Sequence, residues 1–395
     1  MSKRVDWVLL AAVLGLATLS CLLVWSATTH RDALTGGDPQ LFLRKQLLNV
    51  VIGLVLLVVV WSVDHRWLRL LTPIAYLGSI AGLVLVLLHG QTINGSRSWL
   101  SLGGMSLQPS ELAKLAVVAG MALVLAERTE GRWRTRVGVV DVLLMLAVAA
   151  VPTLLIVAQP DLGTTLVLAA TVFGVLAASG TPRRWLAMLA AGGATAAVAA
   201  VAAGVLKDYQ LDRLLAFTDP ALDPKGAGYN TEQARIAIGN GGLFGQGLFH
   251  GTQTRAGFVP EQHTDFVFTV AGEELGLLGA GLLILLLGIV LWRALRIAAR
   301  TDDLFGRVAA AGIACWVGFQ AFQNIGMCLG IMPVTGVPLP FVSYGGTAMF
   351  ASMLAVGLLL NIHARTAALT VPRAPLRAVA TPPRTRPAAP SAAGR

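Results

Sequence analysis

Residues 7–27 read WVLLAAVLGLATLSCLLVWSA, and this stretch decides the fold class. It holds no charged residue, and as a helix it is long enough to cross the roughly 30 Å hydrocarbon core of a bilayer. With Met1-Ser-Lys-Arg in front of it, the stretch is too long for a cleaved signal peptide and is typical of a retained span. We therefore expect a transmembrane helix here.

The 395 residues repeat this pattern along most of the chain. Hydrophobic residues make up 55% and charged residues 13%, whereas a soluble domain carries about 25% charged residues. Because lipid offers no hydrogen-bond partner to the backbone, each apolar segment must be helical. The sequence thus predicts an all-α polytopic membrane protein with ten transmembrane helices in a domain of residues 1–363. The ten segments are 7–27, 45–63, 67–89, 109–126, 138–158, 162–179, 184–206, 265–296, 305–331 and 344–363.

The net charge of +10 has two possible readings, a nucleic-acid partner or membrane topology. If the N-terminus is cytoplasmic, 20 of the 30 Lys and Arg residues fall on the cytoplasmic side. That bias is the one expected of a membrane protein. We therefore expect both termini in the cytoplasm of a cytoplasmic-membrane protein, and no nucleic-acid partner.

Two long polar segments lie outside the predicted helices. Residues 207–264 form a large extracytoplasmic loop between the seventh and eighth helices, and the apolar and aromatic residues in it indicate order. A short interfacial helix is expected at 230–238. Residues 364–395 are basic and rich in proline and arginine. This composition predicts a disordered cytoplasmic tail that contacts anionic membrane lipid.

The sequence QPSELAK, residues 108–114, places a charge pair at the start of a predicted span. Glu111 and Lys114 lie three residues apart, so they share a helix face and can pair. One reading is a capped, charge-neutral helix start, and the other is a charged lining for an outward cavity. Asp161, in the outer turn QPDLGT at 159–164, is likewise either a cap or a cavity residue.

A third group of ionisable residues occurs where the long loop returns to the membrane. In VPEQHTDFVF, residues 259–268, Asp265 heads the eighth predicted helix, and His263 precedes it by two residues. A helix N-terminus favours an ionised carboxylate, so capping is the simple alternative. Glu273 and Glu274 follow about two turns later, and structural hydrogen bonds are expected for them.

The segment 330–347, GIMPVTGVPLPFVSYGGT, cannot be regular helix because of its prolines and glycines. Non-helical backbone at membrane depth needs protein or a water-filled cavity against it. We therefore expect a re-entrant turn in which Ser343 and Tyr344 line a cavity. All four features fall on the outer side. They indicate a site for a ligand with a polar head and a lipid tail, or a transport pathway.

These blocks carry a family resemblance, since the chain resembles the SEDS family of shape, elongation, division and sporulation proteins (RodA, FtsW and SpoVE). The matching blocks run from Asn94-Gly through 108–114 and 159–164, continue from Arg213 to Gly276, and end with 333–346. Residues 247–253 and 332–338 are most similar to the RodA branch. RodA-like chains read Gln-Ser where this one reads Gln233-Ala234, so no hydroxyl role is assigned there.

The resemblance implies a peptidoglycan glycosyltransferase. Such an enzyme polymerises lipid II, the lipid-linked disaccharide-pentapeptide, at the outer face of the cytoplasmic membrane. The family partner is a class B penicillin-binding protein, a single-span transpeptidase. The resemblance places the essential carboxylate at Asp265.

The reaction joins a sugar hydroxyl to an anomeric carbon with inversion, and expels undecaprenyl diphosphate. It needs a base and positive charge for the leaving group, and Asp265 is the candidate base. Predicted diphosphate contacts are Lys114, oriented by Glu111, together with Arg97 and Arg213. Further predicted substrate-binding residues are Asp161, His263, Ser343 and Tyr344. A divalent cation (Mg²⁺ or Mn²⁺) sharing the diphosphate with Asp265 is a further hypothesis, although the sequence contains no metal-binding motif.

The sequence does not exclude two other classes of function. The first is a lipid II flippase or other transporter, which predicts polar groups at the midplane and paired helix breaks in the two halves. The second is a non-catalytic scaffold for a transpeptidase, which predicts that substitution of Asp265 is tolerated.

Overall fold

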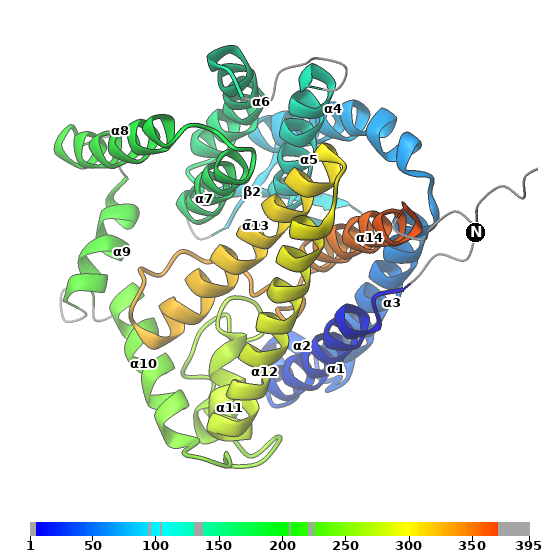
Figure 1. Cartoon of the computed structure of the whole chain (residues 1–395). Coiled ribbons are helices and arrows are strands. Elements are labelled where there is room, and N and C mark those ends of the chain that lie inside the picture. The colour runs from blue at the N-terminus through cyan, green and yellow to red at the C-terminus, as the bar shows by residue number, and fades with distance from the viewer. Residues whose placement is uncertain are drawn as a thin grey trace, which may run out of the picture.

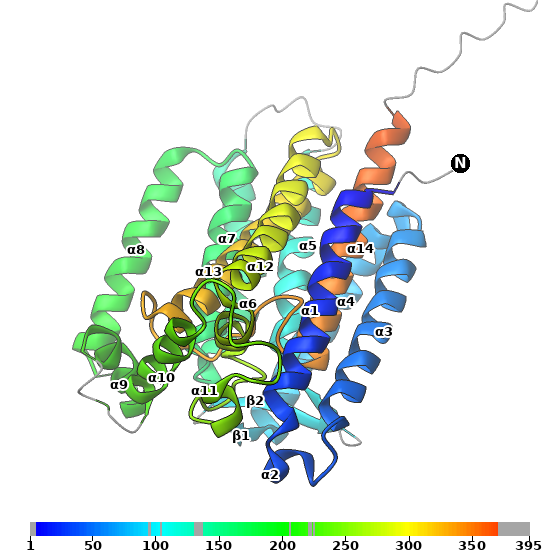
Figure 2. The same cartoon turned by 90° about the horizontal axis from the view of Figure 1, so that it is seen from below.

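The computed structural model describes residues 5–93, 96–102, 105–129, 137–204, 207–219, 223 and 226–369. Long helices run side by side and form one bundle (Figures 1 and 2). The helices are α1 (Trp7–Thr29), α2 (Asp32–Thr35), α3 (Leu41–Ser62), α4 (His65–His89), α5 (Pro109–Thr129), α6 (Val139–Ala158), α7 (Leu162–Ala178), α8 (Arg183–Ala202), α9 (Asp208–Thr218), α10 (Ala227–Asn240), α11 (Thr252–Ala256), α12 (Val267–Arg300), α13 (Leu304–Leu329) and α14 (Gly346–Leu369).

In the described part of the chain, nine helices are long and apolar enough to cross a membrane. They are α1, α3, α4, α5, α6, α8, α12, α13 and α14, and the apolar helix α7, at 17 residues, is shorter. The prediction of an all-α polytopic membrane protein is confirmed, while the count of ten spans stays a prediction. The tail expected from residue 364 begins later than predicted, because residues 364–369 continue α14, and residues 370–395 lie outside the described residues.

Short polar side chains and glycines set where the helices begin and end. Asp6 accepts from the backbone N–H of Leu9 at the start of α1, and Asp303 accepts from that of Gly306 at the start of α13. Gly330 ends α13 in the left-handed conformation, with φ of +74°.

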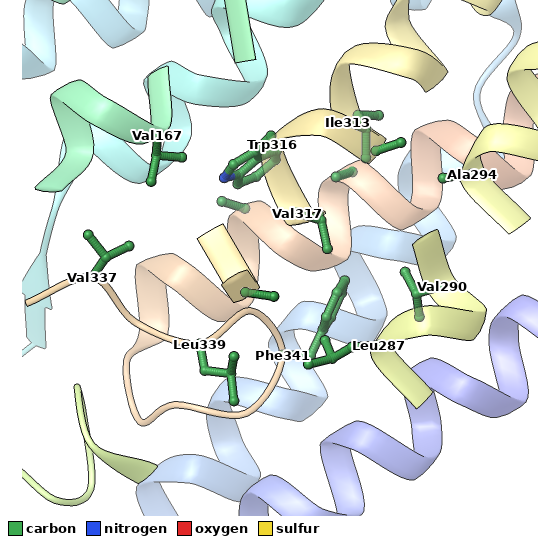
Figure 3. Close-up of a cluster of buried hydrophobic side chains, with 14 of the residues drawn as sticks. Val167, Leu287, Val290, Ala294, Ile313, Trp316, Val317, Val337, Leu339 and Phe341 are labelled. Atoms are coloured by element: carbon green, nitrogen blue, oxygen red, sulfur yellow. The ribbon is translucent and has the colours of Figure 1, made fainter. Parts of the chain in front are cut away.

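Small and apolar side chains make α13 the centre of the bundle. It packs against α12, α7 and α5, while α14 packs against α3. Figure 3 shows Trp316 and Val317 of α13 among Leu287 of α12 and Leu339 of the segment after α13. By contrast, α8 packs against α7 and has no buried side chain in its described length, and Figure 1 shows it projecting from the bundle. The core thus lies around α13.

The outer segment between α4 and α5 contains strands, which the sequence analysis did not predict. Strands β1 (Gln91–Ile93), β2 (Ser96–Leu102) and β3 (Met105–Leu107) form an antiparallel sheet in that order. The Gly/Ser-rich composition concealed the alternation of the strand residues.

Helix α12 is broken at Gly276, where the sequence analysis expected one continuous span. Gly276 has φ of +65° and ψ of −163°, a conformation that is open to glycine. The loop 241–247 fills the break with backbone hydrogen bonds. Gln246 N–H donates to the Glu273 carbonyl (3.0 Å), and Leu277 N–H donates to the Gly242 carbonyl (2.9 Å). The backbone groups that the break frees are therefore satisfied within the protein.

Two acidic residues next to this break hold the long loop. The Glu273 carboxylate accepts from the backbone N–H groups of Gln253 (2.7 Å) and Thr254 (2.9 Å) at the start of α11. Glu274 accepts from the Ser26 hydroxyl of α1 at 2.7 Å. This geometry matches the structural hydrogen bonds expected from the sequence. The described part of 207–264 contains α9, α10 and α11, and α10 includes the interfacial helix predicted at 230–238.

The break predicts an unequal response of two glycines on α12. A methyl group at Gly276 would clash with the backbone of Gly245 and Leu243, and the conformation alone costs about 1–3 kcal/mol for other residues. At Gly281 a methyl group meets nothing within 4 Å. We expect Gly276→Ala to lower the thermal unfolding temperature in detergent and Gly281→Ala to leave it unchanged or raise it. Equal melting temperatures would contradict the break.

Candidate functional site

A cavity of about 290 Å³ opens where the non-helical segments meet. Its walls come from β2 and β3, the turn between α6 and α7, α9, the turn before α12, and the segment that leads into α14. Figure 2 shows the strands and α9–α11 at the end of the bundle opposite the N-terminus. The cavity therefore lies at the end that the charge distribution predicts to face outward.

Asp265 lies in the wall of this cavity, in the turn that precedes α12. Helix α12 begins at Val267 with Phe266 as its N-cap, so Asp265 does not cap the helix. Its carboxylate makes no hydrogen bond to the described residues and is partly exposed to the cavity. A carboxylate that is enclosed yet unpaired indicates a chemical rather than a structural role.

The surroundings of Asp265 raise its pKa toward neutral pH. Burial raises the pKa of Asp265 to about 7, and the negative charges of Glu261 and Asp161 act in the same direction, whereas Arg213 opposes them. A carboxylate with a pKa near the working pH is a far stronger base than an ordinary aspartate and is still ionised in part.

Arg213 of α9 is the only Lys or Arg among the described residues that line the cavity. Its guanidinium lies 5.6 Å from the centroid of the Tyr209 ring. The Tyr209 hydroxyl and the Gln210 side-chain amide both donate to the Pro160 carbonyl, at 2.9 and 3.1 Å. These bonds hold α9 against the turn that carries Asp161, and so keep Arg213 in the lining of the cavity.

Asp161 combines both roles that the sequence left open. Its carboxylate caps α7 by accepting from the Thr164 N–H at 2.9 Å and from the Thr164 hydroxyl at 2.8 Å. It also lines the cavity, as does Tyr344. The structure therefore brings together four of the predicted site residues, namely Asp265, Arg213, Asp161 and Tyr344.

Lys114 and Glu111 lie in the core instead of the cavity wall. The Lys114 ammonium donates to Glu111 (2.7 Å) and to the Gln320 side-chain oxygen (2.6 Å), and lies 5.4 Å from the centroid of the Trp316 ring. Neither side chain is more than 1% exposed. The predicted diphosphate contact is not supported, because the charge of Lys114 is already neutralised within the protein.

Arg97 also lies outside the cavity lining. Its guanidinium donates to the carbonyls of Gly90, Leu87 and Leu88 at 2.8–3.1 Å, which are the free carbonyls at the end of α4. The structure therefore supports a capping role for Arg97 and not the diphosphate contact that the sequence predicted.

The side chains of His263 and Ser343 lie beside the residues that line the cavity. The His263 ring packs against Phe42 and Tyr344, with centroids 5.1 and 5.6 Å away, and burial lowers its pKa below the ordinary value. The Ser343 hydroxyl accepts from the Leu339 N–H at 2.7 Å within the re-entrant turn. Neither residue belongs to the described lining, so direct substrate contact is not supported for them.

The sequence analysis missed other lining residues. Trp99, Tyr209, Gln210 and Glu261 all face the cavity. Only Glu261 carried a signal, its closeness to Asp265 in the sequence, whereas the others depend on how β2 and α9 fold over the site. Among the described residues, no group of three or more His, Cys, Asp or Glu side chains is arranged to hold a metal ion. The divalent-cation hypothesis therefore finds no preformed donor set here.

The chain is similar to known proteins along most of its length. The family model for FtsW, RodA and SpoVE, described as "Cell cycle protein", matches residues 6–368. The chain is 39% identical over 367 residues to peptidoglycan glycosyltransferase MrdB of Escherichia coli K12, covering 91% of this chain and 94% of that protein. It is 36% identical over 361 residues to stage V sporulation protein E of Bacillus subtilis, covering 90% and 96%.

Two solved structures are also similar. A chain from a structure titled "Structural coordination of polymerization and crosslinking by a peptidoglycan synthase complex" matches with a TM-score of 0.75 and 34% identity, over 91% of this chain and 98% of that one. The rod shape determining protein RodA of Thermus thermophilus matches with a TM-score of 0.65 and 32% identity, over 92% and 97%. The chain therefore belongs to the FtsW/RodA/SpoVE (SEDS) family.

Proposed function

We propose that this protein polymerises lipid II into β-1,4 glycan strands for cell elongation and shape, with Asp265 as the general base. The activity class, peptidoglycan glycosyltransferase, follows from the family and from the names of its relatives. The observation that carries the assignment of Asp265 is its unpaired carboxylate in the cavity, whose described lining also holds Arg213.

The proposed step is a single displacement. Asp265 accepts the proton of the acceptor sugar's 4-hydroxyl while that oxygen bonds to the anomeric carbon of the donor. The bond from this carbon to the diphosphate oxygen breaks, and undecaprenyl diphosphate leaves with the electron pair. Arg213 stabilises the negative charge on the leaving group. The proton on Asp265 then passes to water, so that the carboxylate is ready for the next cycle.

The cavity supports a substrate with a polar head near the membrane surface. Its lining combines hydroxyl and amide side chains with Trp99 and Tyr209, a mixture suited to sugar rings. The proposed location is the cytoplasmic membrane with the cavity facing outward, in keeping with the charge bias of the sequence.

A class B penicillin-binding protein is the proposed partner. The support is the solved peptidoglycan synthase complex, whose title names both polymerisation and crosslinking and one chain of which this protein resembles along nearly its whole length. The polymer made here would then be crosslinked by the partner's transpeptidase.

The transporter reading has less support. A transporter of the inverted-repeat type places its site near the midplane and breaks helices in both halves of the chain. Here the break at Gly276 and the non-helical segment after Gly330 both belong to the second half, and the cavity lies at one end.

Removal of the carboxylate tests the proposal and also the scaffold reading. We expect Asp265→Asn to lower polymerisation of labelled lipid II by the purified complex by at least about 100-fold, the usual contribution of a general base. Asp212→Asn on the exposed side of α9 is the matched control and should keep full activity. An active Asp265→Asn would refute the assignment.

The raised pKa predicts the pH dependence of the rate. Because the base must be ionised, kcat should rise with pH through about 7 and level off above it. Removing a neighbouring negative charge with Glu261→Gln should lower the pKa of Asp265 and move the profile to lower pH. The measurement is the initial polymerisation rate across this range, and an unmoved profile would argue against titration of Asp265.

The two arginines should respond differently to substitution. We expect Arg213→Leu to lower kcat/KM roughly 10- to 100-fold, since a hydrogen bond to a charged group is lost. Arg97→Leu should reduce the melting temperature instead, because three carbonyls lose their donor, and leave kcat/KM of the folded protein nearly unchanged. The reverse pattern of effects would support a diphosphate contact for Arg97.

A further inference from the structure

A row of buried amides on α13 supports the wall of the cavity. Gln320, Gln323 and Asn324 share one helix face by their spacing and are at most 1% exposed. Their amide groups donate to the re-entrant segment, with Gln320 bonded to the Pro338 carbonyl (2.8 Å) and Gln323 to the Thr335 hydroxyl (2.8 Å). Buried amides in a membrane protein are costly unless they are paired.

Asn324 differs from the two glutamines because it bridges two segments. Its Nδ2 donates at 2.7 Å to the backbone carbonyl of Asp265 and at 2.7 Å to that of Val337. Both partners are acceptors only, so the nitrogen end of the amide must point at them. One side chain thus joins the turn that carries the carboxylate to the re-entrant segment.

The two segments meet closely at the reactive group. A methyl group built on Gly336, the neighbour of Val337, would lie 3.2 Å from Asp265 Oδ2. The carboxylate itself has no hydrogen bond to the described residues, so its position depends on its backbone. Asp265 N–H donates to the Glu261 carbonyl at 3.0 Å within the turn, and Tyr344 N–H of the re-entrant segment donates to the His263 carbonyl at 2.9 Å. The Asn324 amide adds a bond from α13 to the Asp265 carbonyl itself.

We propose that Asn324 is a positioning residue that sets the place of the Asp265 carboxylate in the cavity through these two backbone hydrogen bonds. The proposal rests on the function proposed for Asp265. Asn324 does not contact the substrate, and it acts by keeping the turn and the re-entrant segment at a fixed separation.

The test replaces the amide by a side chain of similar size without a donor. In Asn324→Leu the two carbonyls lose their partner, and the turn can move relative to the cavity wall. A shift of about 1 Å in a reacting group costs about 100-fold, so we expect that loss in kcat. KM for lipid II should change little, because the residues that line the cavity are intact.

A second asparagine provides the matched control. Asn361 of α14 is 5% exposed and donates to the carbonyls of Val60, Trp61 and Val63 at 2.7–3.1 Å, at the far end of α3. Asn361→Leu removes the same kind of bond away from the cavity. It should lower the melting temperature as Asn324→Leu does, yet keep kcat per folded molecule. If the two variants have equal kcat per folded molecule, the proposal fails.

A second pair of variants covers the case in which Asn324→Leu does not fold. Asn324→Gln keeps a donor, whereas Asn324→Met has similar length and none. We expect the glutamine variant to have the higher kcat, and equal kcat values would overturn the proposal. Asp265→Asn in the same assay distinguishes failure of the function proposed for Asp265 from failure of the positioning role of Asn324. If it is active, the function proposed for Asp265 fails; if it is inactive while the Asn324 variants match their controls, the positioning role alone fails.

Discussion

Every backbone polar group at membrane depth must find its partner inside the protein, and this constraint shapes the whole site. A continuous helix meets it alone, but a helix alone forms no cavity wall. The structure departs from helix at Gly276 and again after Gly330, and each departure is paired from elsewhere. Loop 241–247 supplies backbone groups to the first, and the amides of α13 supply side-chain donors to the second.

The same constraint sorts the charged residues into two kinds. Charges enclosed in the bundle are neutralised where they lie, as with Lys114 and Glu111, or are held by several donors, as with Glu273. Asp265 is the contrast, since no described residue bonds to its carboxylate and burial raises its pKa to about 7. An ionisable group without structural pairing is the expected property of a group reserved for chemistry.

Sequence reasoning identified the kinds of residue in the site, but it predicted only some of the residues that line the cavity. Asp265, Arg213, Asp161 and Tyr344 line the cavity as expected, because outward position follows from the order of the spans. Arg97 and Lys114 were selected for their charge alone. Whether a guanidinium faces a ligand or three carbonyls depends on how the chain folds back at that point, and the partners of Arg97 lie only 7–10 residues before it. The strands of 91–107 and the break at Gly276 were not predicted, because a Gly/Ser-rich composition and one glycine in an apolar run are weak local signals.

By itself, the sequence determined the membrane class and a resemblance that led to the family, and it predicted the spans and their orientation, because hydropathy, charge bias and motifs are local properties of the chain. Only the tertiary structure decided which polar residues meet. The Glu111–Lys114 pair points into the core, and α9 and β2 fold over the cavity. Asn324 joins the backbone at Asp265 to that at Val337. These outcomes depend on packing between segments that are from 13 to 206 residues apart in the chain, where each buried polar group takes whichever partner the fold brings within hydrogen-bond distance.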